Sequence, residues 1–175
     1  MPKIRVSLNS ASIDNAIRQL ESYNKKLETA GNEIAKRLCE IGYDVASGVM
    51  GGHIYTGETI SSLRVEKVAD NRYVLKAGSK ALLFFEFGAG VIGYGHPLAG
   101  KFHMGPGTYP GKGHWNNPKG WFYPTDDPAL VHHYDEDGQG WAISHGNAPH
   151  MPFYQADVAI REQILTVARE VLSGD

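Results

Sequence analysis

A seven-residue hydrophobic repeat dominates the first third of the chain. Its first row is Ile13, Leu20, Leu27, Ile34 and Ile41, and its second is Ile17, Leu38 and Val45, interrupted by Asn24 and Gly31. Rows spaced three and four apart form one stripe on a helix. The pattern predicts one helix of about ten turns, or two helices broken near Gly31-Asn32. Because the second row has gaps, we expect an internal packing face rather than a free coiled coil.

Shorter patterns flank this helix. Alternation over residues 3–8 predicts a strand, followed by Ser12 as N-cap of the long helix, which glycines 48, 51 and 52 then end. Residues 63–68 and 73–77 predict a hairpin around an Asp70-Asn71 turn. Pro152 opens a last helix, whose apolar stripe is Phe153, Ala156, Ile160, Ile164, Val167 and Val171.

Between residues 88 and 150 the periodicity disappears. This segment is rich in glycine, histidine and proline, and it also carries all three tryptophans. Disordered segments lack aromatic residues, so we expect a projecting loop that becomes ordered on contact. Residues 120–123 and 140–144 are candidates for a hairpin around residues 135–138.

The block from Ala81 to Gly90 places one carboxylate, Glu86, among apolar side chains, just before a Gly-x-Gly break. It predicts a strand or a short helix. A buried carboxylate requires partners. We expect Glu86 to cap a turn or to bind the amides of residues 88–90, in preference to acting as a catalytic acid.

Composition narrows the class of protein. The chain has 175 residues, enough for one domain with a core, and a net charge of -2, which does not favour nucleic-acid or anionic-membrane binding. The single Cys39 excludes an internal disulfide and is expected to be a core thiol. No apolar run is long enough for a membrane span or a signal peptide, so we expect synthesis and initial retention in a cytoplasm.

Catalytic and metal chemistry find little support in the motifs. His132, His133, Asp135 and Asp137 are metal-ligand types, but adjacent side chains of a strand point to opposite faces. The chain has no Gly-x-Ser-x-Gly elbow, and its Gly-rich segments lack Walker spacing. We therefore expect no catalytic residue, no cofactor and no metal, with a metal-dependent hydrolase using the His-rich segment as the rival from another class.

Several motifs, in order, carry a family resemblance. After the long helix come Thr56-Gly57 and Leu63-Arg64-Val65, then Phe84-Phe85-Glu86-Phe87-Gly88-Ala89-Gly90. Residues 107–113, Gly120-Trp121-Phe122, residues 137–141 and Pro149-x-x-Pro152-Phe153 follow. The chain thereby resembles the phage tail-completion and head–tail joining proteins, similar to minor tail protein Z.

The resemblance implies a structural virion protein, assembled in the host cytoplasm, that completes the tail at its head-proximal end. It implies a ring of copies, six of which would fit a sixfold tail, with the tail tube protein and a neck or head-completion protein as partners. No membrane and no sequence-specific nucleic acid are expected. A neck or head-side adaptor that contacts the portal is the alternative of the same class.

We expect an α+β fold comprising one domain over residues 1–175, with an insertion at about 88–150. The terminal helices would pack on a small, mainly antiparallel sheet. Aromatics supply contact area and glycines permit close approach, so we select candidates for a subunit interface on this basis. They are Glu86, Phe87, Gly88, Gly90, Trp115, Trp121, Phe122 and Trp141.

Overall fold

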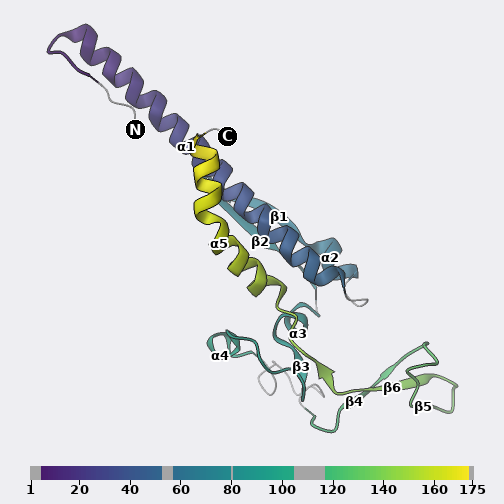
Figure 1. Ribbon diagram of the computed structural model, residues 1–175. Coiled ribbons are helices and arrows are strands. Elements are labelled where there is room, and N and C mark those ends of the chain that lie inside the picture. Colours follow the sequence, from purple (N-terminus) through teal and green to yellow (C-terminus); the bar gives the residue numbers. More distant parts are fainter. Residues whose placement is uncertain (1–4, 53–56, 80, 105–116, 174–175) are drawn as a thin grey trace.

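The computed structural model describes residues 5–52, 57–79, 81–104 and 117–173. The protein is an elongated α+β molecule, in which two helices run side by side and a smaller part extends from one end (Figure 1). The elements are α1 (Ser10–Gly51), α2 (Gly57–Ser62), β1 (Arg64–Ala69), β2 (Arg72–Lys76), α3 (Leu82–Phe87), β3 (Ala89–Gly90), α4 (Ala99–Phe102), β4 (Trp121–Pro124), β5 (His133–Tyr134), β6 (Gly140–Ser144), β7 (Gly146–Asn147) and α5 (Pro152–Ser173).

Helix α1 is continuous over 42 residues, so Gly31 does not break it. Its N-cap is Asn9, whose side-chain oxygen accepts a hydrogen bond of 2.8 Å from the Ser12 amide. The expectation that Ser12 caps the helix is therefore wrong. The Ser12 hydroxyl instead accepts a bond from the amide of Ser7, where the chain turns into the helix.

The strand expected over residues 3–8 is not formed over its described residues, 5–8. Val6 is 56% exposed and Leu8 is fully exposed. These residues lie near the far tip of α1, away from the three small sheets (Figure 1). Alternation in the sequence does not produce a strand where the chain finds no partner strand and no core.

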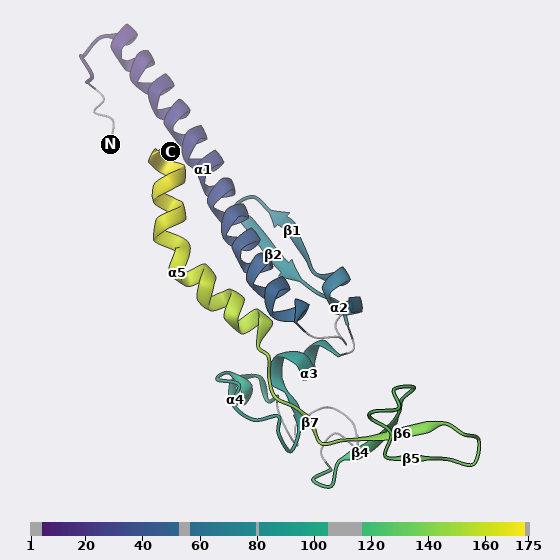
Figure 2. The same ribbon diagram turned by 45° about the vertical axis from the view of Figure 1, so that its right-hand side comes forward.

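The other elements pack around the C-terminal half of α1. Helix α5 runs antiparallel along it, and the hairpin of β1 and β2 covers another side (Figure 2). A Cβ atom at Gly42 would lie 2.7 Å from Cδ1 of Ile160, so glycine permits the close approach of α5. The expected hairpin is confirmed, with Asn71 at a φ of 56° in its turn. The main core cluster is Ala46, Met50, Leu63 and Ala156, and Cys39 is buried as expected.

The apolar stripe of α1 divides into two parts. From about residue 31 onward it faces α5 and the hairpin, as expected for an internal packing face. Before that point, Ile13, Ile17, Leu20 and Leu27 are 43–56% exposed. For this N-terminal half, the expectation of internal packing is wrong, because α5 ends near the middle of α1 (Figure 1).

The Glu86 block forms the short helix α3, which settles the choice between strand and helix. Beyond it, β3 pairs with β7, and a three-stranded antiparallel sheet has the order β4-β6-β5. The expected pairing of residues 120–123 with 140–144 is confirmed as β4 and β6, but the turn at residues 135–138 belongs to the hairpin of β5 and β6 instead. This sheet extends away from the helices, at the end opposite the N-terminal tip (Figure 2). Among the described residues, no helix has the length and apolar character needed to cross a membrane.

Candidate functional site

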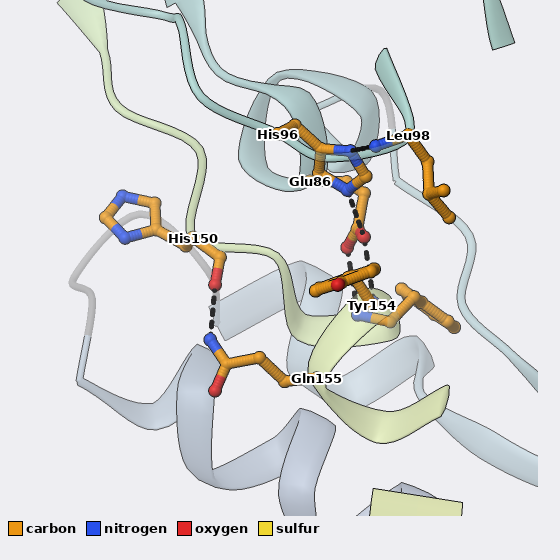
Figure 3. Close-up of polar contacts among 7 residues, drawn as sticks. Glu86, His96, Leu98, His150, Tyr154 and Gln155 are labelled. Carbon is orange, nitrogen blue, oxygen red and sulfur yellow. Dashed lines mark hydrogen bonds and ion pairs between the residues drawn. The ribbon is translucent and has the colours of Figure 1, made fainter. Parts of the chain in front are cut away.

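The carboxylate of Glu86 lies at the N-terminus of α5. Its two oxygens accept hydrogen bonds of 2.9 Å from the amides of Phe153 and Tyr154 (Figure 3). First-turn amides of a helix have no intrahelical partner, and a Ser, Asp or Asn at the N-cap would normally satisfy them. Met151 precedes Pro152 here and offers no such oxygen. Glu86 therefore caps α5 from a distant helix, where its charge also complements the helix dipole.

His96 completes the surroundings of this carboxylate. Its Nε2 lies 3.0 Å from Oε1 of Glu86, and its Nδ1 accepts a 3.0 Å bond from the amide of Leu98. Because Nδ1 is an acceptor, the hydrogen-bond network assigns the proton to Nε2, which donates to Glu86. Both residues are buried, each with an exposed fraction of 7%. Every partner of Glu86 is a donor within the same chain, so the carboxylate acts as a structural acceptor.

Aromatic rings enclose this polar group. The ring of Phe87 lies 4.3 Å from that of His96 and 6.0 Å from that of Phe102, and Tyr154 meets His96 edge-on at 5.5 Å. Phe87 is only 8% exposed. Phe87, which the sequence suggested as an interface residue, thus lies inside its own subunit. Its ring excludes water from the Glu86–His96 hydrogen bond.

Gly88 and Gly90 shape the chain directly after this site. Both have positive φ angles, of 78° and 67°, that side chains rarely adopt. A Cβ at Gly88 would lie 2.7 Å from Cα of Gly93, and one at Gly90 would overlap the carbonyl of His145. Both glycines therefore serve close backbone packing, and Gly90 pairs with Gly146 in the β3–β7 ladder.

The same region closes the base of the 88–150 segment. The side-chain Nδ2 of Asn147 donates to the carbonyl of Phe84 at 2.8 Å, and the backbone amide of His150 donates to the carbonyl of Phe85 at 2.9 Å. Together with the bonds from α5 to Glu86, these contacts join the residues that precede the segment to those that follow it. The segment therefore leaves the helical body and returns to it at one place.

A pocket of about 790 Å³ adjoins Glu86. Its lining is largely apolar and includes Leu75, Leu82, Leu98, Phe102 and Phe153. Three of its four Lys and Arg residues pair with carboxylates: Lys76 with Glu66 at 3.0 Å, Arg161 with Asp157 at 2.9 Å and Arg64 with Glu66 at 3.8 Å. The fourth, Lys101, lies 5.7 Å from the centre of the Phe102 ring. The pocket thus suits an apolar group better than a free ion.

The remaining aromatic candidates lie on the three-stranded sheet. The register pairs Phe122 with Ile143 and Pro124 with Trp141, so Phe122 and Trp141 share one face of the sheet. Trp121 pairs with Ser144 and belongs to the other face. Phe122 is 48% exposed and Ile143 37%. The structure thus separates these aromatics from the Glu86 group, and Trp121 from Phe122 and Trp141, while Trp115 lies outside the described residues.

Asp135 orders the turn that leads into β6. Its carboxylate accepts bonds from the indole Nε1 of Trp141 at 2.8 Å and from the amides of Gln139 and Asp137. These bonds, that from Trp141 foremost, lower the pKa of the Asp135 carboxyl. Asp135 is thereby committed to the turn, and it fixes the orientation of the Trp141 ring.

The His-rich segment forms an aromatic contact. The rings of His132 and His133 lie 6.0 Å apart at 85°, and both meet the ring of Phe122 edge-on, at 5.5 and 5.0 Å. Across the described ranges, no three His, Cys, Asp or Glu side chains cluster as a metal site would require.

Two features of the site were absent from the sequence-based expectations. His96 was not singled out as the partner of Glu86, and the amides that Glu86 binds belong to α5 rather than to residues 88–90. The Gly95-His96-Pro97 turn, a polar residue between two chain-bending residues, was the available signal for His96. No family model, curated protein or solved structure matches the chain.

Proposed function

We propose that the protein is a structural subunit of a tailed phage that completes the tail at its head-proximal end and enables joining of the head. The order of the motifs supports this identification. The observation that carries an assembly role is the apolar surface left uncovered at both ends of the molecule. One end has the N-terminal stripe of α1, and the other has the exposed face of Phe122 and Ile143.

The geometry suggests how such a subunit works. Apolar patches that a monomer leaves exposed are typical of association surfaces. The Glu86 site fixes the direction in which the projecting sheet leaves the helical body, since it ties α3 to the start of α5. In a closed ring, every copy has the same orientation towards its neighbours and towards the tail. A rigid junction at Glu86 would keep the projecting sheet at one angle to the helical body in every copy.

We place the contact with the tail tube or neck on the face that Phe122, Trp141 and Ile143 share. Exposed aromatic side chains on a rigid strand make effective interface anchors. The change Phe122→Asp should abolish head–tail joining and leave folding intact, because Phe122 is half exposed. Tyr134→Asp is a matched control, since Tyr134 is 62% exposed on the opposite face of the same sheet.

The experiment is complementation of a phage that lacks this gene. Complete tails that fail to join filled heads support the proposal. Heads that lose their DNA support the neck or head-side adaptor instead. Wild-type infectivity from the Phe122→Asp phage would reject the proposed contact face. Unchanged infectivity after changing His132 and His133 to alanine would reject the hydrolase.

A further inference from the structure

The N-terminal half of α1 carries an apolar face that the rest of the described chain leaves open. Ile13 and Leu27 are 43% exposed, Ile17 48% and Leu20 56%. In both ribbon views this half of α1 extends beyond the end of α5, and the residues before it turn back beside its first turns (Figures 1 and 2).

The spacing along this face follows the alternation of a coiled coil. From Ile13 the steps are four, three, four and three residues, to Ile17, Leu20, Asn24 and Leu27. This places Ile17 and Asn24 at the a positions of a heptad, and Ile13, Leu20 and Leu27 at the d positions. A β-branched residue at a with leucine at d favours two parallel strands, and one asparagine at a selects that state and its register.

Charges beside the stripe favour the same arrangement. One flank, the e positions, carries Asp14, Glu21 and Glu28. The other flank, the g positions, carries the uncharged Ala16, Tyr23 and Ala30, of which Ala16 is only 9% exposed in the single chain. An antiparallel pair of identical helices would set the acidic flanks against each other, because e then faces e. A parallel pair sets each acidic flank against a neutral one, since e then faces g.

We propose that a second copy of this chain covers this face, as a parallel, in-register, two-stranded coiled coil over residues 13–28. Asn24 of each copy then faces its counterpart and can hydrogen-bond to it. The pairing must end near Gly31, where a Cβ would lie 2.8 Å from the side-chain oxygen of Asn71. The hairpin of the same chain occupies the stripe from there on, so the two bodies diverge below this point. The pairing surface is separate from the Phe122 face, and its test does not depend on a role in phage.

The first experiment measures the mass of the full chain by light scattering and sedimentation, up to high micromolar concentration. The wild type should be a dimer that dissociates on dilution. Leu20→Asp should shift it to a folded monomer, because Leu20 is exposed in the single chain, and the melting temperature of this monomer should not depend on protein concentration as that of the wild type does. Ser22→Asp on the opposite side of α1 is the matched control and should remain dimeric. A wild-type monomer, or a dimer that persists in Leu20→Asp, would overturn the proposal.

The second experiment tests the direction of pairing. Cysteine at position 13 should form a disulfide with its counterpart on mild oxidation, because parallel helices bring equal positions together. In an antiparallel pair the two sites would lie at opposite ends of the contact, about 20 Å apart. The wild type is the control, since its single Cys39 is buried. A dimeric Ile13→Cys protein that fails to cross-link would rule out the parallel arrangement.

Discussion

The imidazole of His96 and the carboxylate of Glu86 lie ten residues apart in the chain and 3.0 Å apart in space. The same carboxylate holds the first amides of α5, so one side chain connects three segments: α3, the turn at His96 and the C-terminal helix. Both oxygens of Glu86 therefore accept hydrogen bonds from the chain itself.

Removing the charge of Glu86 should therefore destabilise the monomer. In Glu86→Gln, the amide group would turn one acceptor into a donor that faces another donor. Loss of a bond to a buried charged group costs about 1–3 kcal/mol. Thermal and urea unfolding should show this loss. Glu66→Gln, at an exposed pair with Lys76 and Arg64, is the control and should cost at most about 1 kcal/mol. Equal melting temperatures for wild type and Glu86→Gln would contradict this role.

The change His96→Phe tests the hydrogen bonds of His96 separately from the packing of its ring. Phenylalanine keeps a ring against Phe87 but leaves the Leu98 amide and one oxygen of Glu86 with one partner fewer. We expect a loss of about 1–3 kcal/mol in the free energy of unfolding. Amide exchange at Leu98 should accelerate at the same time. Unchanged exchange at Leu98 would show that its amide does not depend on His96.

Alanine at Gly90 should disrupt the base of the projecting segment. The added Cβ would overlap the carbonyl of His145 and would require a positive φ. We expect more than about 1 kcal/mol of destabilisation. Gly48→Ala is the contrasting change, because Gly48 lies within α1 with no atom in the way, and it should stabilise by about 0.5–1 kcal/mol. Similar unfolding midpoints for the two variants would refute the difference.

The turn at Asp135 should lose order in acid. Its pKa is lower in the folded state, so its contribution is complete above the ordinary aspartate value, about pH 4. That contribution is lost as the pH falls through the lower, folded-state value. The fluorescence of Trp141, whose indole binds Asp135, should report this change. Asp135→Asn should abolish the acid transition, whereas Glu136→Gln, on an exposed neighbour, should keep it.

The elements that the sequence predicted well are those with local signals. The repeat in α1, the Asp70-Asn71 turn and Pro152 each specify their element through nearby residues, and the structure has all three. The strand over residues 3–8 failed because a strand also needs a partner, which alternation in the sequence does not reveal. The same holds for the stripe of α1, since its periodicity says nothing of how far α5 reaches.

The candidate site was predicted in part. Isolation among apolar residues showed that Glu86 needs partners, and glycines at 88 and 90 showed that the chain bends there. The identity of those partners depends on contacts over 67 and 68 residues, which no local pattern encodes. Phe87 shows what aromatic character alone leaves open. Its aromatic character suggested an interface, but the ring is buried against His96 and Phe102 in its own subunit.

The closed base of the 88–150 segment has a consequence for how such a protein can change over time. The segment leaves and re-enters the helical body where α3, the β3–β7 pair and the start of α5 are in contact. Its length and sequence can therefore vary while α1 and α5 stay in place. A different recognition segment can therefore replace the part between Gly90 and Gly146, by evolution or by design, while these contacts stay the same. A short linker between Gly90 and Gly146 is the smallest such replacement.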